Sequence, residues 1–279
     1  MDKIKIITDS TCDLPQEIIK KYDIEVMPVL INFGEDSYLE GIEITRDEMM
    51  DRIERDDCLP TTAQITPMRF EECYGKYIKE GYKIVAIHMS SKMSGTYQSA
   101  LIAKNEFNDD DLVIIDALTI TSGLGMLVLK AAKLVKEGHL IHEIEKEILT
   151  YRSKIKSDLF FLSLDNLVRG GRLSKGKAMI VSALGIKLIL EIKNGEMDVK
   201  NKVRGSKKAI KEIIKNFEDS DRKLDEPVIL INYEGEEIAE ALRTYLEDND
   251  IEYIETTVGC AVGIHSGKNA GGFFFVENY

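Results

Sequence analysis

The strongest constraint on the fold is an alternation in the first half of the chain, where short β-branched runs are separated by longer amphipathic stretches. The strand-like runs are residues 3–8, 25–32, 83–89 and 112–116. The stretches with helical spacing are residues 45–54, 66–80, 95–107 and 119–136. Strands joined by helical crossovers form mostly parallel sheets with helices on their faces. The pattern therefore predicts an α/β lobe with a mostly parallel sheet.

The second half of the chain has a different pattern. Strand-like runs at residues 186–191 and 197–203 are joined through Asn194 and Gly195, a dipeptide typical of tight hairpin turns. Further strands are expected at residues 158–164, 227–232, 252–258 and 272–276, and helices at residues 206–217 and 234–248. This half predicts a second lobe of the α+β class with a mixed sheet, beginning near residues 151–157.

Charge and hydropathy exclude several classes of protein. A net charge of -12 disfavours general nucleic-acid binding, and 44% hydrophobic residues disfavour disorder. The most apolar region, residues 180–192, is interrupted by Lys187 and is shorter than the roughly 18 residues of a spanning helix, so no stable membrane insertion is expected. The N-terminus lacks a signal-peptide pattern, which predicts a cytoplasmic location. The four cysteines show no paired spacing and are expected to be reduced and packed as small apolar side chains.

Hydroxyl-rich loops follow the expected strands, at the ends where open α/β sheets bind their ligands. Residues 8–11 contain three hydroxyls and Asp9, and Asp13 is expected to cap a helix. Thr61 and Thr62 lie between two prolines that restrict the backbone. A capped turn explains the first loop equally well, whereas two adjacent threonines favour a ligand role for the second.

A third loop, residues 88–99, runs from a strand into a helix. Ser94, Gly95 and Thr96 are expected on the first helical turn, where backbone N–H groups and the helix dipole attract an anion. Glycine there allows a ligand to approach the backbone closely. The simpler interpretation, a serine N-cap, explains Ser94 but not the other hydroxyls.

The fourth loop, residues 258–272, holds five glycines and His265. A histidine in a glycine-rich turn is less often a packed core residue, so a ligand role is expected. The imidazole is suited to donate to a carboxylate and to titrate near neutral pH.

Two basic segments, residues 169–177 and 200–211, interrupt the acidic chain, and the second includes Arg204. Such segregation indicates a phosphate or an acidic partner, with a solvated face as the alternative. Residues 171–178 nearly match a phosphate-binding P-loop, but Ala178 replaces the Ser or Thr that coordinates magnesium.

Enzymatic alternatives remain open. An esterase or acyltransferase would use Ser94 and His265, with Asp9 as the third member, although no G-x-S-x-G elbow surrounds any serine. A phosphate-transfer enzyme would use the loop at residues 171–178. The remaining histidines form no metal-ligand cluster, and no metal or cofactor is expected; they are His88, His139 and His142.

The order of these motifs resembles the DegV family of bacterial fatty-acid-binding proteins. The motifs are Thr-Asp-Ser-Thr at residues 8–11, Pro-Thr-Thr-Ala-Gln at 60–64, the segment 90–100, Asp116 followed by 122–125, and the segment 166–174. The resemblance covers residues 3–277. It implies a two-lobed fold with lobes at about residues 1–155 and 156–279, and a long-chain fatty acid buried between them.

The resemblance also implies roles for individual residues. The hydroxyls of Thr62 and Ser94, beside Gly95, would hold the fatty acid carboxylate, and His265 would lie near this head group. Hydroxyls suit such a site because a fixed positive charge buried beside the tail would cost several kcal/mol when the site is empty.

The family's better-known members present the bound acid to a separate fatty acid kinase for phosphorylation. By resemblance, Arg204 lies near the phosphoryl-transfer site, and Arg169 and Arg172 belong to the surface offered to the kinase. The expected protein is thus a lipid carrier of phospholipid metabolism, not an enzyme, and its ligand is the fatty acid itself.

Overall fold

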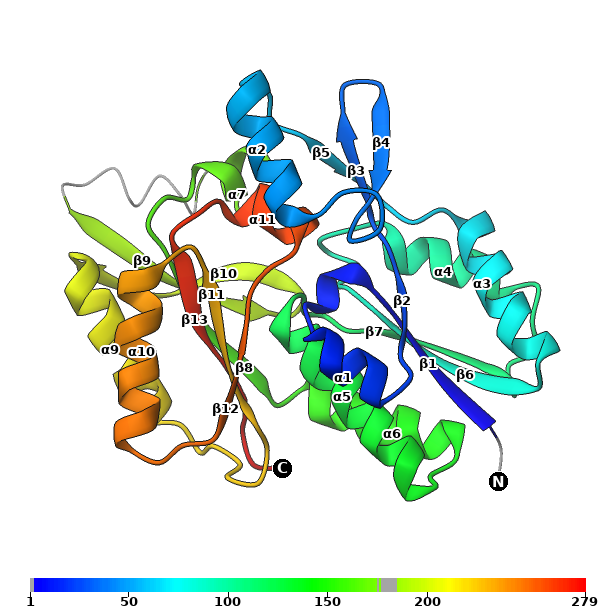
Figure 1. Cartoon of the computed structure of the whole chain (residues 1–279). Coiled ribbons are helices and arrows are strands. Elements are labelled where there is room, and N and C mark those ends of the chain that lie inside the picture. The colour runs from blue at the N-terminus through cyan, green and yellow to red at the C-terminus, as the bar shows by residue number, and fades with distance from the viewer. Residues whose placement is uncertain (1–2, 175, 177–184) are drawn as a thin grey trace. The chain divides into compact units, whose positions relative to one another are not determined.

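The computed structural model describes residues 3–174, 176 and 185–279 (Figure 1). The chain divides into two compact units. One is Met1–Ser153 together with Gly259–Ala261, and the other is Lys154–Val258 together with Val262–Tyr279. A parallel sheet in the first unit and a mixed sheet in the second confirm the predicted fold class.

The main sheet of the first unit is parallel and has the strand order β2-β1-β6-β7. Its strands are β1 (Lys3–Asp9), β2 (Glu25–Met27), β6 (Tyr82–His88) and β7 (Leu112–Asp116). Helices α3 (Pro67–Lys79) and α4 (Thr96–Lys104) cover one face, and α5 (Ser122–Glu137) and α6 (Ile141–Arg152) cover the other (Figure 1). The strands are runs of Ile and Val because both of their faces are buried.

A small antiparallel sheet with the order β4-β3-β5 accompanies the main sheet. Its strands are β3 (Leu30–Phe33), β4 (Asp36–Leu39) and β5 (Thr61–Ala63), and α2 (Arg46–Asp56) follows β4. The single strand expected at residues 25–32 is wrong, because β2 and β3 belong to different sheets. Pro28 has no N–H for a ladder, and the N–H of Val29 donates to Ser10 Oγ instead.

The expectation that Asp13 is the N-cap residue of a helix is wrong. Asp13 closes the 3₁₀ helix η1 (Ser10–Cys12) in the left-handed conformation, and Pro15 precedes α1 (Gln16–Lys21). The Asp13 side chain accepts hydrogen bonds from the Thr121 hydroxyl and the Gly259 N–H. Its partners are remote in sequence, which a local capping rule does not detect.

The second unit has a six-stranded sheet in the order β10-β9-β8-β13-β11-β12. Its strands are β8 (Ile155–Phe161), β9 (Ile186–Lys193), β10 (Glu196–Arg204), β11 (Val228–Tyr233), β12 (Tyr253–Thr256) and β13 (Ala270–Val276). Helices α9 (Ser206–Glu218) and α10 (Glu236–Asp248) bury Ile213, Phe217 and Leu242 in one core with Phe273 and Phe275. The predicted hairpin between β9 and β10 is present, and Asn194 and Gly195 both have positive φ, as such turns require.

Two short helices complete the described chain, α7 (Asp165–Arg169) and α11 (Cys260–Ser266). The glycine-rich turn expected at residues 258–272 is therefore wrong in its first half. Gly263 serves close packing, because a β-carbon there would lie 2.8 Å from the Tyr233 hydroxyl. A glycine needed for packing within a helix has the same sequence signature as one needed for a turn.

Candidate functional site

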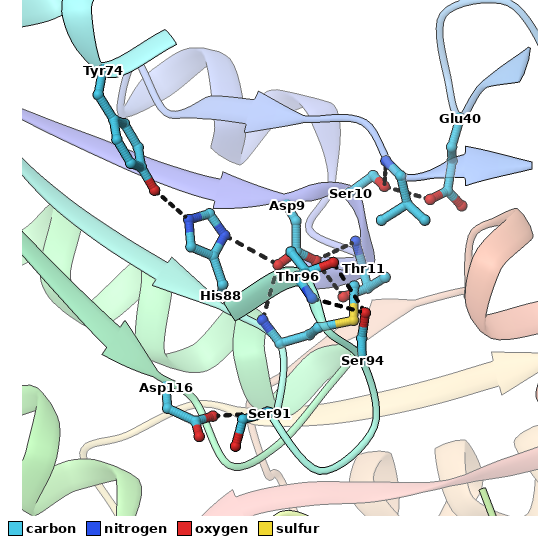
Figure 2. Close-up of polar contacts among 12 residues, drawn as sticks. Asp9, Ser10, Thr11, Glu40, Tyr74, His88, Ser91, Ser94, Thr96 and Asp116 are labelled. Carbon is cyan, nitrogen blue, oxygen red and sulfur yellow. Dashed lines mark hydrogen bonds and ion pairs between the residues drawn. The ribbon is translucent and has the colours of Figure 1, made fainter. Parts of the chain in front are cut away.

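The carboxyl ends of β1, β6 and β7 lie at one edge of the parallel sheet and end in Asp9, His88 and Asp116 (Figure 2). The loop between β6 and α4, residues 89–95, starts at this edge. It carries Ser94, whose side chain is half-buried. The polar strand-end residues and this loop form the candidate site of the first unit.

Ser94 is arranged as a hydrogen-bond donor. Its Oγ accepts from the Thr96 N–H at 3.2 Å and lies 3.0 Å from Thr96 Oγ1, which is buried. When the Thr96 hydroxyl donates as well, both lone pairs of Ser94 Oγ are used and its proton is left for another acceptor. A carboxylate, which only accepts, suits this arrangement.

Helix α4 begins at Thr96, later than the sequence analysis placed it, and Gly95 is its N-cap residue. Ser94 and Gly95 therefore precede the first turn. The N–H of Thr96 is taken by Ser94 Oγ, so this amide is not available to an anion. At this position the hydroxyl of Ser94, and not the amide of Thr96, is the group available for hydrogen bonding.

Gln64 connects this loop to the strand that carries Thr62. Its amide donates to Ser99 Oγ at 2.9 Å and fills the space that a β-carbon on Gly95 would occupy. Thr62 lies two residues earlier on β5, opposite Ile31 of β3, and is half-buried. Thr62 and Ser94 thus belong to two segments that contact each other. The sequence analysis noted the motif containing Gln64 but did not assign this contact.

Asp9 is fully buried and accepts from four donors. Its Oδ1 receives the N–H of Thr11 at 3.2 Å and the Thr11 hydroxyl at 2.5 Å. Its Oδ2 receives the Met89 N–H at 2.9 Å and lies 3.3 Å from His88 Nδ1. Sequence reasoning did not pair Asp9 with His88, because the two residues are 79 positions apart and only the sheet brings them together.

Glu40 and Asp13 bind the segment Gly259–Ala261, which is remote in sequence but belongs to the first unit. Glu40 Oε1 accepts from the Ala261 N–H at 2.9 Å, and the Ser10 hydroxyl donates to Oε2. Asp13 Oδ1 accepts from the Gly259 N–H at 2.8 Å. Burial raises the pKa of both carboxyl groups, and that of Asp13 lies well above its usual range. The sequence contained no signal for this attachment.

His265 lies in the second unit, near the end of α11. Burial and the charge of Arg172 lower its pKa to about 4. The expectation that it titrates near neutral pH is therefore wrong, and the imidazole is neutral at pH 7. Gly170 permits its position, since a β-carbon there would overlap Nδ1. His265, Gly170 and Arg172 form one cluster, in which the Arg172 guanidinium also donates to the Gly170 carbonyl.

The three predicted arginines of the second unit differ in exposure. Arg169 is exposed and donates to Asn166 Oδ1 at 2.9 Å, and Arg204 is exposed at the end of β10. Arg172 is half-buried, and burial lowers its pKa. The P-loop-like stretch at residues 171–178 extends outside the described residues, which lack 175, 177 and 178.

The cysteines are free, and burial raises the pKa of Cys73 and Cys260 to about 12 and that of Cys12 further. Cys58 is exposed, which corrects the expectation that all four are packed. Within residues 3–174 and 185–279, no group of three or more His, Cys, Asp or Glu side chains is placed to hold a metal ion. No helix in the same part of the chain has the length and apolar character needed to cross a bilayer.

The comparisons with known proteins identify relatives over the whole chain. The family model described as "Uncharacterised protein, DegV family" matches residues 3–278. A DegV domain-containing protein of Clostridium perfringens is 59% identical over 279 residues, covering 100% of both chains.

Two solved structures have the same fold. One is a DegV family protein from Thermus thermophilus, described by its fatty acid binding. It is 30% identical with a TM-score of 0.89, covering 99% of this chain and 100% of that one. The other is DegV from Bacillus subtilis, described as a fatty acid binding protein. It is 28% identical with a TM-score of 0.87, covering 100% of both chains.

Proposed function

Because this chain belongs to the DegV family, we propose that it binds a long-chain fatty acid and holds the carboxylate with the hydroxyls of Thr62 and Ser94. The observation that carries the proposal is the Ser94 hydroxyl, which accepts from the Thr96 N–H and, when the Thr96 hydroxyl also donates to it, keeps its own proton for a ligand. The solved structures described as fatty acid binding share the whole fold and support the choice of ligand.

The chemistry of the site suits an acid with a long apolar tail. Each CH₂ group removed from water contributes about 0.8 kcal/mol, so the tail supplies most of the affinity. The head group then needs hydrogen-bond donors that can be buried without the cost of a fixed charge. Two hydroxyls meet that need, and Gly95 leaves room beside them for the Gln64 amide.

We further propose that the protein is a cytoplasmic carrier that presents the acid to a fatty acid kinase. Arg169 and Arg204 are exposed and available to an acidic partner or a phosphoryl group. His265, neutral at pH 7 and close to Arg172, can accept or donate a hydrogen bond. Arg169 and Arg172 are proposed to contribute to docking the kinase, and charge reversal at the exposed Arg169 is expected to weaken kinase-dependent acyl phosphate formation while fatty acid binding persists.

The esterase alternative has less support. A nucleophilic serine needs a base within hydrogen-bond reach, and the hydroxyl partner of Ser94 in the first unit is Thr96, which is not basic. The four acceptor positions of Asp9 are used by Thr11, Met89 and His88. Asp9 therefore has no acceptor position left with which to orient His265.

Lipid extraction and native mass spectrometry of the purified chain test the ligand class. We expect a copurified long-chain fatty acid. After delipidation, the double variant Thr62→Val with Ser94→Ala should bind palmitate at least roughly tenfold more weakly, which corresponds to about 1.4 kcal/mol. The matched control is Thr150→Val with Ser153→Ala on exposed positions of the same unit, and it should bind like the wild type. Unchanged palmitate affinity in the first variant would remove the head-group assignment.

A further inference from the structure

The buried side chain of Asp9 is surrounded by hydrogen-bond partners. Three of them are donors, the N–H and hydroxyl of Thr11 and the N–H of Met89, and the fourth is His88 Nδ1 at 3.3 Å, which donates in the tautomer that carries its proton there. His88 Nε2 lies 3.0 Å from the Tyr74 hydroxyl. Burial raises the pKa of Tyr74 well above its usual range, so the phenol stays protonated and donates to Nε2 in the tautomer whose proton is on Nδ1.

The hydrogen-bonded series Tyr74–His88–Asp9 is fully buried and closely packed. All three side chains have 0% relative exposure. Phe70 packs edge-on against the His88 ring, with 4.8 Å between the ring centroids. These three side chains therefore exclude solvent from the strand ends of β1 and β6, and a substrate cannot reach them. Despite its composition, the series is not a catalytic triad.

The series ends on the loop that carries Ser94 (Figure 2). Asp9 Oδ2 takes the N–H of Met89, the Thr119 carbonyl takes that of Ser90, and Asp116 Oδ1 takes that of Ser91. Three successive amides are thus fixed by groups at or beyond the ends of the flanking strands β1 and β7.

The rest of the loop is built on Ser90. Lys92 N–H donates to Ser90 Oγ, and the N–H groups of Met93 and Ser94 donate to the Ser90 carbonyl at 3.0 and 3.1 Å. Hydrogen bonds therefore connect Ser94 through Ser90 to the peptide at Met89, whose N–H donates to Asp9.

We propose that Asp9, held by His88 and Tyr74, is a positioning residue that orients the Ser94 hydroxyl toward the fatty acid carboxylate. The inference rests on the proposed function and adds the residues that give the site its preference for an acid head group. Asp9 touches no ligand atom itself and acts through the loop. Its loss should therefore reduce recognition of the carboxylate and leave binding of the tail unchanged.

The test compares two ligands with the same tail, palmitate and cetyl alcohol, by calorimetric titration of the delipidated full chain. The wild type should prefer the acid. Asp9→Asn, which replaces an acceptor by an amide N–H₂, should reduce the acid-to-alcohol affinity ratio roughly tenfold, with the alcohol affinity within about twofold of wild type. Tyr74→Phe, which removes one hydroxyl, should reduce the ratio about threefold. A merely structural role would weaken both ligands equally.

Asp158→Asn is the matched control, because Asp158 is an equally buried carboxylate on β8 of the other unit. It should keep the wild-type ratio even if stability falls. A wild-type ratio in Asp9→Asn, or in Tyr74→Phe if the first variant does not fold, overturns this inference while leaving the fatty acid proposal intact. A wild type that binds neither ligand, or both equally, overturns the fatty acid proposal, and this inference with it.

Discussion

Asp9 and Asp158 are both fully buried carboxylates at a sheet, yet their partners differ in kind. Asp158 lies 2.8 Å from the Lys200 ammonium and accepts from the Asn216 amide, which ties α9 to the sheet. Asp9 is satisfied by two backbone N–H groups, a hydroxyl and His88.

The difference separates two uses of a buried charge. A carboxylate paired with a lysine joins secondary-structure elements, and its neighbours are other side chains of the framework. A carboxylate satisfied by amides fixes the conformation of the chain that supplies them, because amide donors cannot move without the backbone. In this protein the carboxylate satisfied by amides is Asp9, next to the loop of Ser94. The carboxylate paired with a lysine is Asp158, in the core of the other unit.

The largest effect on the free energy of unfolding is expected when Asp158 loses its lysine partner. Lys200→Met leaves a buried carboxylate without its cation and should cost about 3 kcal/mol of unfolding free energy, at the low end for a buried pair because the Lys200 side chain is 26% exposed. Burial already raises the pKa of Asp158, so the variant's loss should grow as pH rises and shrink where the carboxyl is protonated.

Urea unfolding at about pH 5 and about pH 8 measures this loss. Lys202→Met, an exposed lysine on the same strand, is the matched control and should cost little. The acid-to-alcohol ratio of Lys200→Met should equal that of the wild type. A changed ratio would show that the two buried carboxylates do not have separate roles.

An intermediate effect is expected at Gly95. A β-carbon there displaces the Gln64 amide, which must give up its hydrogen bond to Ser99, so Gly95→Ala should cost about 1 kcal/mol. In a Gln64→Ala background the same substitution should cost almost nothing. A double-mutant cycle measures the coupling. Additive costs would contradict the assigned contact between the ends of β5 and α4.

The smallest effect concerns Asp13. Its pKa is raised in the folded protein, so between the ordinary value and the raised one the folded state holds a proton that the unfolded state has lost, and stability falls as pH rises. Asp13→Asn does not titrate. Its unfolding free energy relative to wild type should therefore improve from about pH 5 to about pH 8. Asp110→Asn, an exposed control, should show no such trend; a flat difference for Asp13→Asn would contradict the raised pKa.

Much of the fold was predictable from local patterns. The strand at residues 112–116 was placed at its observed bounds, and the hairpin at Asn194 and Gly195 was identified from its turn chemistry. The hydroxyl-rich loops after β1 and β6 were predictable because a parallel sheet collects strand ends at one edge, whereas the loop expected around Thr61 and Thr62 is wrong, because both residues lie on β5 of the antiparallel sheet. These features depend on residues that are close in sequence or on a general rule of topology.

The remaining features depend on tertiary packing. Asp9 and Tyr74 meet only through His88, which had been considered as a metal ligand and rejected without another role. His265 was expected in a turn, but it lies on helix α11, where Gly263 is needed for packing against Tyr233. Burial also lowers the pKa of His265, so its imidazole is neutral at pH 7. Neither the hydrophobic periodicity nor the motif spacing of a sequence identifies a contact with a residue on a distant strand.

The most direct test of the account is carbon-13 NMR of palmitate labelled at the carboxyl carbon and bound to the delipidated protein. Hydrogen bonds from Thr62 and Ser94 predict a bound carboxyl resonance that differs from the free acid and shifts in Ser94→Ala, while Thr150→Val with Ser153→Ala leaves it in place. The same bound resonance in the wild type and in Thr62→Val with Ser94→Ala would contradict the claim that these hydroxyls hold the carboxylate.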